Sequence, residues 1–178
     1  MEKYKMRRVR TLGYEGSNIE DFCATLRAAS VDYVIDVRER ALSRKKGFSK
    51  KAFAEHLAKN GIRYVHLRGL GDPKAGRDAA KNGDYQLFRK IFGAHLLTEK
   101  AQSDLAIAIQ LCSQWDSCLV CFERDPAHCH RTIVAKLLME KCRGDIQNLY
   151  VSKKASRILN ASTERRDTRF SEGAASCW

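Results

Sequence analysis

The stretch SCLVCFERDPAHCHRTIVAKLLMEKC, residues 117–142, decides the fold, because an apolar run stops there at a charged corner and a helical pattern follows. Cys118–Phe122 is apolar without alternation, which is typical of a strand buried on both faces of a parallel sheet. Asp125 and Pro126 predict the N-cap and first residue of a helix whose apolar face includes Ile133–Leu138. The carboxyl end of such a strand, facing a helix N-terminus, is where open α/β sheets bind ligands, and it favours an anion.

Other parts of the chain repeat this alternation of strand and helix. Further strands are predicted at Arg8–Gly13, Val31–Val37, Ile62–Leu67 and Asp145–Val151. Ser17 and Glu20 form a capping box for one helix, and Ser49 is the expected cap of a second helix that ends at Asn60-Gly61. Tyr85–Trp115 is helical in period, with a break expected at Gly93 and the polar stretch after it.

This order of elements predicts an α/β fold with three layers, in which a mostly parallel sheet of about five strands has helices on both faces. Residues 68–84 are rich in Gly, Pro and Asp and predict a long loop. Apolar periodicity is lost from Ser152 onward. We therefore expect one α/β domain over residues 1–151 and a basic C-terminal tail over residues 152–178.

Composition narrows the classes of function. The chain has 178 residues and a formal net charge of +12, which favours a nucleic acid, a nucleotide or another phosphorylated small molecule as partner. It contains neither a membrane-length apolar run nor the apolar core of a signal peptide, so a cytoplasmic protein without a membrane segment is expected. Seven cysteines, an odd number, predict free thiols rather than a disulfide framework. The sequence carries no signal for a cofactor or for an oligomeric state.

Polar residues cluster where the predicted strands end. Because the carboxyl ends of parallel strands meet at one edge, we expect these groups to converge. They are Tyr14 and Glu15, Asp36 and Arg38, His66, and Glu123 and Asp125. Asp36 is costly to bury alone, so it is either a structural ion pair with an arginine or a carboxylate held for general base chemistry. Glu123 is the second candidate carboxylate, and Glu15 and His66 are weaker catalytic candidates.

A basic loop follows the strand that ends near Asp36. It places Ser43, Arg44, Ser49 and Lys50 around a turn at Gly47. Arginine forks, lysine charges and free backbone N–H groups at a helix start suit a phosphate clamp, while a solvated basic face is the alternative.

Cys129, His130 and Arg131 allow several interpretations. Cys129 and His130 stand at helical spacing from the apolar face, so both could pack in the core. We expect Cys129 to be such a packing residue that alkylates slowly. Metal binding is a weaker interpretation, because the nearby cysteines and histidines show no recognised ligand spacing. Residues 35–39, IDVRE, followed later by LVC, resemble rhodanese-like sulfurtransferases, although the C-x5-R spacing is absent after both Cys121 and Cys129.

The motifs together resemble a family known mainly in bacteria, domain of unknown function family 488. The matching pieces are TLGYEG at 11–16, IEDF at 19–22, DVRERALSRKKGFSKKAF at 36–53, GIRYVHLRGLG at 61–71 and CFERDPAHCHR at 121–131. Ala41 stands where a proline is common in that family. The resemblance covers roughly residues 8–151 and implies an α/β domain, but it supplies no reaction. Its shared polar residues match Tyr14, Glu15, Asp36, Arg38, Ser43, Arg44, Ser49, Lys50, His66, Glu123, Asp125, Cys129, His130 and Arg131.

The leading hypothesis is an enzyme that hydrolyses a glycosidic or phosphoester bond in a nucleic acid, nucleotide or other phosphorylated substrate. Asp36 and Glu123 would be its acid/base pair, while Arg44, Lys50 and Arg131 would hold phosphate. One alternative is a non-catalytic nucleic-acid-binding module that uses the basic loop and tail. Another is a rhodanese-like cysteine-dependent transferase.

Overall fold

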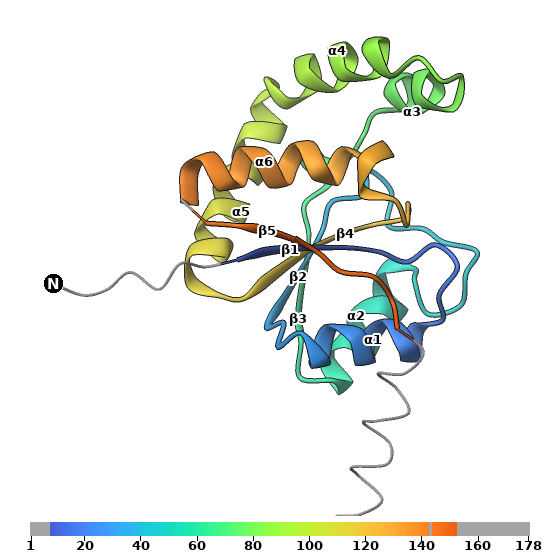
Figure 1. Ribbon diagram of the computed structural model, residues 1–178, viewed down its shortest axis with the longest axis vertical. Coiled ribbons are helices and arrows are strands. Elements are labelled where there is room, and N and C mark those ends of the chain that lie inside the picture. Colours follow the sequence, from blue (N-terminus) through green and yellow to red (C-terminus); the bar gives the residue numbers. More distant parts are fainter. Residues whose placement is uncertain (1–7, 143, 153–178) are drawn as a thin grey trace, which may run out of the picture.

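The computed structural model describes residues 8–142 and 144–152 and contains one sheet of five parallel strands, in the order β3-β2-β4-β1-β5 (Figure 1). The strands are β1 Val9–Gly13, β2 Tyr33–Asp36, β3 Arg63–His66, β4 Ser117–Cys121 and β5 Ile146–Asn148. All four strand pairings are parallel. The predicted α/β fold is therefore confirmed.

Helices cover both faces of the sheet. They are α1 Ile19–Ala28, α2 Lys50–Lys59, α3 Lys74–Lys81, α4 Tyr85–Leu96, α5 Glu99–Gln114 and α6 His130–Cys142. Helices α1 and α2 lie below the sheet in Figure 1, whereas α6 lies above it with α3 and α4 beyond. Two short 3₁₀ helices, Arg68–Leu70 and Pro126–His128, lie between these elements.

Strand β4 is the centre of the packing because apolar side chains meet it from both sides. Leu119 belongs to the apolar cluster under α4, α5 and α6, together with Phe92 and Leu138. Val120 belongs to the opposite cluster, which contains Phe22 and other side chains from α1 and α2. All five β4 residues are buried. This two-sided burial explains the apolar run without alternation.

The order of the strands creates a crevice at the carboxyl edge. The chain leaves β1 and β2 toward the α1–α2 face, but it leaves β4 toward the α6 face. Because β4 lies between β1 and β2, the chain leaves β4 toward the face opposite to that taken after either neighbouring strand. Ligands bind at such switch points in open parallel sheets.

Two predicted caps of helices are wrong in detail. Asn18, not Ser17, caps α1, and its side chain accepts a hydrogen bond from the Asp21 backbone N–H at 2.7 Å. The Ser17 hydroxyl instead donates to the Tyr14 carbonyl, 2.7 Å away, and closes the preceding turn. Asp125 caps only the short 3₁₀ helix, because the chain turns again before α6 begins.

Two further predictions need correction. Residues 68–84 do not form one long loop, since α3 occupies Lys74–Lys81 within them. Gly93 lies inside α4, and the break falls at Leu97 and Thr98, where the Thr98 side chain caps α5. At the start of α2, the rings of Phe48 and Phe53 pack with their centroids 5.6 Å apart.

Within the described residues, no helix combines the length and the apolar character needed to cross a membrane. The predicted basic tail, apart from Ser152 itself, lies outside the described residues.

Gly13, at the end of β1, packs too closely against the corner after β4 to accept a larger residue. A Cβ atom on Gly13 would lie 1.8 Å from the Glu123 carbonyl oxygen, so β1 and the corner after β4 must separate to admit it. We expect Gly13→Ala to lower the free energy of unfolding by about 2 to 3 kcal/mol in urea denaturation.

Gly93→Ala is the matched control, because a Cβ there meets nothing within 4 Å and the position is an exposed helix interior. This change should raise the free energy of unfolding by up to about 1 kcal/mol. Equal stability of the two variants would contradict the close packing at Gly13.

Candidate active site

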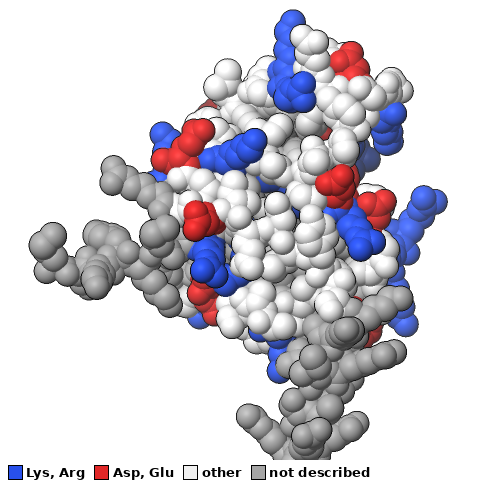
Figure 2. Space-filling view, in the orientation of Figure 1, with Lys and Arg blue, Asp and Glu red and all other residues white. Residues whose placement is uncertain are grey.

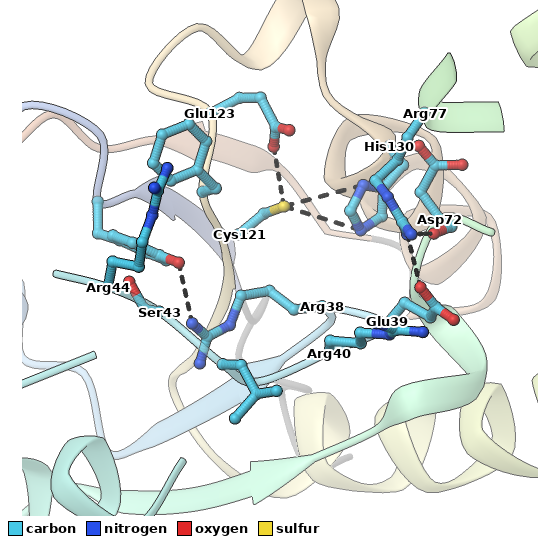
Figure 3. Close-up of a pocket in the computed structure, with 13 residues that line it drawn as sticks. Arg38, Glu39, Arg40, Ser43, Arg44, Asp72, Arg77, Cys121, Glu123 and His130 are labelled. Carbon is cyan, nitrogen blue, oxygen red and sulfur yellow. Dashed lines mark hydrogen bonds and ion pairs between the residues drawn. The ribbon is translucent and has the colours of Figure 1, made fainter. Parts of the chain in front are cut away.

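The crevice at the carboxyl edge holds a pocket of about 380 Å³ (Figure 3). Its walls come from the segments that follow β1, β2, β3 and β4. The lining residues are Tyr14, Arg38, Glu39, Arg40, Leu42, Ser43, Arg44, Asp72, Arg77, Cys121, Phe122, Glu123 and His130. The predicted convergence of strand ends is therefore present, although not every predicted residue takes part.

Asp36 and Arg38 form a buried ion pair beside the pocket. Arg38 Nε lies 2.8 Å from Asp36 Oδ1, and Arg38 Nη2 lies 2.6 Å from Asp36 Oδ2. The Tyr64 hydroxyl donates to Oδ2 at 2.8 Å, and the Arg38 backbone N–H donates to Oδ1 at 3.1 Å. Both Asp36 oxygens are thus engaged and the side chain is fully buried. This geometry supports the structural interpretation of Asp36, and the carboxylate is absent from the pocket lining.

The same pair fixes the neighbouring strands and loop. Arg38 Nη1 donates to the Tyr14 hydroxyl at 3.0 Å and to the Phe48 carbonyl at 2.9 Å. The Tyr14 ring stacks on Phe48 at 4.4 Å. Burial and the negative charge of Asp36 raise the pKa of Tyr64 above its usual range, so this hydroxyl remains a donor. One arginine therefore connects β2 with β1 and with the basic loop.

The two serines of the basic loop hold its shape. The Ser49 hydroxyl donates to the Ser43 carbonyl at 2.9 Å and accepts from the Ser43 N–H at 3.1 Å. The Ser43 hydroxyl accepts from the Lys45 N–H at 3.1 Å. Only Ser43 and Arg44 of the predicted clamp residues line the pocket, while Lys50 is exposed outside it.

Arg131 does not face the pocket. Its side chain is fully buried, and Nη2 donates to the Arg124 carbonyl at 3.1 Å while Nε donates to the Thr11 hydroxyl at 3.3 Å. Nη1 donates to the Glu123 carbonyl. Arg131 therefore holds the corner after β4 and does not line the pocket.

Three other predicted residues lie away from the pocket. His66 Nε2 is 2.7 Å from the Arg38 carbonyl, which makes it a structural group. Glu15 accepts from the Arg124 N–H at 3.0 Å and lines a separate small hollow. Asp125 is exposed, and the Ala127 N–H and His128 bind its carboxylate, which keeps its pKa below the usual value.

Two thiols, a carboxylate and an imidazole converge at the floor of the pocket. Glu123 Oε2 lies 2.9 Å from Cys121 Sγ and 3.2 Å from Cys129 Sγ. Cys121 Sγ is 3.8 Å from His130 Nδ1. These four side chains offer ligand atoms that all lie within 4.8 Å of one another. Figure 3 shows Cys121 between Glu123 and His130.

This convergence involves a thiol that also belongs to the core. Cys121 is buried in the apolar cluster under α4, α5 and α6, and it lines the pocket as well. These four residues have no recognised ligand spacing in the sequence, because Cys121 ends a strand, Glu123 lies in the corner, and Cys129 and His130 lie at the start of a helix. Such spacing has no common sequence pattern, so only the strand–corner–helix geometry reveals it.

The cluster shifts the protonation of its members. Burial, followed by the adjacent Cys129, raises the pKa of Cys121 well above the ordinary value. Burial raises the pKa of Cys129, but the hydrogen bond with Cys121 and the charge on His130 lower it more. The pKa of Cys129 therefore lies well below the ordinary value. Burial and the charge of Cys129 raise the pKa of Glu123. Burial lowers the pKa of His130, but the charge of Cys129 and the hydrogen bond to the Val37 carbonyl outweigh burial and raise the pKa to about 9.

Asp72 is a site residue that the sequence did not indicate. It is buried, lines the pocket, and its Oδ1 has no hydrogen-bond partner among the described residues. Burial raises its pKa to about 6 against the opposing charges of His130 and Arg77. Its only sequence signal is an acid before Pro73 in a segment that resembles a loop. Gly76 leaves room for it, because a Cβ there would lie 2.2 Å from Oδ1.

Arginines dominate the rim. Arg77 pairs with Glu39, whose Oε2 lies 2.7 Å from Nη1. Arg40 and Arg44 are exposed, and neither forms an ion pair within the described part of the chain. Figure 3 shows Arg44 and Arg77 on opposite sides of the pocket. The rim is therefore suited to an anion that bridges the two sides.

Comparison with known proteins identifies one related family. A family model described as domain of unknown function DUF488 matches residues 18–138. Neither the curated proteins nor the solved structures contain a match to this chain.

The buried ion pair leads to a stability prediction. Asp36→Asn removes one charge and leaves Arg38 buried without a counter-ion, so the free energy of unfolding should fall by about 3 to 5 kcal/mol. Asp78→Asn is the control, since Asp78 forms an exposed pair with Lys74 and should change stability by less than about 0.5 kcal/mol. Urea titrations at neutral pH would measure both, and similar values for the two variants would contradict the role given to Asp36.

Asp72 leads to a pH prediction. Its folded-state pKa of about 6 exceeds the ordinary 3.8, so the folded protein binds the proton more tightly. The stabilisation from this proton is complete below the ordinary pKa and is lost as pH rises through about 6. Asn cannot lose a proton, so Asp72→Asn should gain about 1 to 2 kcal/mol over the parent between about pH 4 and pH 8. Unfolding measured across this range tests the gain, which should be absent in Asp78→Asn.

Proposed function

The chain belongs to the DUF488 family, and from this premise and the pocket geometry we propose that it is an enzyme that hydrolyses a phosphorylated substrate. The observation that carries the proposal is the pairing of exposed arginines at the rim with carboxylates in the pocket. Arg40 and Arg44 lack acidic partners within the described residues, while Asp72 and Glu123 line the same pocket. Anion binding and proton transfer can therefore act on one molecule.

The rim supports phosphate binding in particular. Guanidinium groups present parallel donors that match phosphate oxygens, and an unpaired arginine has these donors available. Arg40 and Arg44 would take the phosphate-binding role that the sequence gave to Arg44, Lys50 and Arg131. A pocket of about 380 Å³ accommodates a nucleotide-sized ligand. A nucleotide or the end of a nucleic acid strand is therefore the favoured substrate class.

Two carboxylates in the pocket support a hydrolytic reaction. Asp72 would replace Asp36 as the general base, because Asp72 Oδ1 has no partner among the described residues whereas both Asp36 oxygens are engaged. Asp72 would accept a proton from the attacking water as the new oxygen bond to phosphorus forms. The bond to the leaving oxygen would then break, and that oxygen would take a proton from solvent. The phosphate charge would remain on the rim arginines.

The non-catalytic binding module receives less support. A duplex backbone is bound by a continuous basic surface. On the face shown in Figure 2, Lys and Arg are scattered and Asp and Glu stand among them. The cysteine-dependent transferase also fits less well, because burial raises the pKa of Cys121, the thiol that lines the pocket, and Cys129 is buried and does not line it.

Phosphate binding provides the test. The double variant Arg40→Gln, Arg44→Gln should bind a nucleoside monophosphate at least about tenfold more weakly, since each charged hydrogen bond contributes about 1.5 to 3 kcal/mol. Arg89→Gln on α4 is the control, because Arg89 is exposed and away from the pocket. Calorimetric titration measures the affinity, and phosphate release from a nucleotide panel measures turnover. Unchanged binding by the double variant, or release that survives Asp72→Asn, would refute the proposal.

A further inference from the structure

The cluster at the floor of the pocket has the composition of a metal site. Cys121 is the last residue of β4, and Cys129 and His130 lie where α6 begins. All three are buried, whereas Glu123 is partly exposed. Three of the four groups are therefore attached to a buried strand and to a helix packed on it. Ligands on such elements hold their geometry better than ligands on a free loop.

The distances are close to those of tetrahedral coordination. Bond lengths of about 2.0 to 2.3 Å to zinc place neighbouring ligand atoms about 3.3 to 3.8 Å apart. Glu123 Oε2 is 2.9 Å and 3.2 Å from the two sulfurs, and Cys121 Sγ is 3.8 Å from His130 Nδ1. Since all four ligand atoms lie within 4.8 Å of one another, small side-chain movements would place them around one ion.

The surroundings of His130 suit a metal ligand. Its Nε2 lies 2.7 Å from the Val37 carbonyl, which requires an N–H at Nε2 and leaves Nδ1 as the coordinating nitrogen. Metal-bound histidines usually donate their second ring N–H in this way, and the contact fixes the tautomer. Val37 directly follows β2 and is itself buried. Cys121 Sγ lies 3.8 Å from Nδ1 and 3.9 Å from Nε2, so the Val37 contact fixes the tautomer and a small rotation of the ring would direct Nδ1 at the ion.

The donor set selects the ion. Two thiols and an imidazole favour a borderline-soft metal over Mg²⁺ or Ca²⁺, which prefer oxygen ligands. We propose that Cys121, Cys129 and His130 bind Zn²⁺ at the floor of the pocket, with Glu123 as the fourth and exchangeable ligand. Three protein ligands and one open position characterise catalytic zinc, whereas four fixed ligands characterise structural zinc. Glu123 is the exchangeable one because it lines the pocket and lies in the corner after β4.

The ion adds a second role for this pocket, and this role rests on the proposed function. A substrate oxygen or a water that displaced Glu123 from zinc would lie in the pocket that Asp72 and Arg44 also line. Zinc lowers the pKa of bound water and polarises phosphoryl oxygens. Binding of the ion itself requires only the four side chains, so it can be tested separately from hydrolysis.

Metal content and cobalt spectra test the site. The full chain, purified under reducing conditions without chelator, should contain about one zinc per chain by mass spectrometry. After removal of zinc, Co²⁺ should give sulfur-to-metal charge-transfer absorption and the intense visible bands of tetrahedral coordination. The apo protein should compete for zinc against a chromogenic chelator with a dissociation constant of about a nanomolar or tighter. Substoichiometric zinc together with a missing thiolate band would overturn the proposal.

Variants assign the ligands. Cys121→Ser and Cys129→Ser should each weaken zinc binding at least about a hundredfold, while Glu123→Gln should keep the thiolate band and alter the visible bands. Cys23→Ser is the matched control, because Cys23 is a buried thiol in the opposite apolar cluster. Circular dichroism verifies folding, and if a ligand variant unfolds, the wild-type chelator competition decides alone. Zinc binding unaffected by both cysteine changes would overturn the assignment.

The two proposals fail in different ways. Arg40→Gln with Arg44→Gln should lose phosphate affinity and keep zinc, whereas Cys129→Ser should lose zinc. Phosphate release by a chain that binds no zinc would remove the metal proposal and leave the hydrolase. Tight zinc binding without phosphate affinity would remove the hydrolase proposal and leave the metal site. Fast alkylation of Cys121 or Cys129, equal with and without zinc, would overturn the metal site and favour thiol chemistry.

Discussion

The carboxyl edge of this sheet depends on the buried ion pair between Asp36 and Arg38. Two charges without access to water are stable only where every polar atom is satisfied, and here Tyr64, Tyr14 and the Phe48 carbonyl complete the network. The network spans β1, β2, β3 and the loop before α2. It fixes the direction in which the chain leaves β2, and hence where Arg40 and Arg44 stand. The affinity of the rim for an anion thus depends on a buried pair whose charges are already satisfied within the protein.

A second buried arginine holds the other side of the crevice. Arg131 donates to the carbonyls of Glu123 and Arg124 and so fixes the corner after β4, where Gly13 leaves no room for a Cβ. In the sequence, Arg38 and Arg131 resemble residues that could bind an anion, because each is a positive charge near the end of a predicted strand. The sequence does not show that both side chains are buried. Burial separates the positioning arginines from the binding ones, and the exposed Arg40 and Arg44 are the binding candidates.

The sequence predicts the fold better than the site, for physical reasons. The apolar run of β4 is long enough to indicate burial on both faces, and the alternation of elements then implies a parallel sheet with a shared carboxyl edge. Helix α3 was missed because Gly and Pro obscure its pattern, and Asp72 was missed with it. The sequence places Cys121 in a buried strand, but it does not show which side chains from other elements lie beside its sulfur. Partners at Glu123 and His130 come from different elements, and their approach depends on how β4 and α6 pack.

The pocket separates its two tasks between different parts of the chain. One side of its rim comes from the segment after β2, which the Asp36–Arg38 network holds in place, and the other side includes Arg77 of α3. Its floor comes from β4 and the start of α6. Substitutions at the rim can therefore change which anion is bound while the thiols, Glu123 and His130 keep their places. Substitutions at the floor would also disturb the packing of the core, because Cys121 and His130 are packed against apolar side chains under α4 and α6. The floor residues are thus constrained by the packing of the fold, whereas the exposed rim residues can vary and so determine which anion is bound.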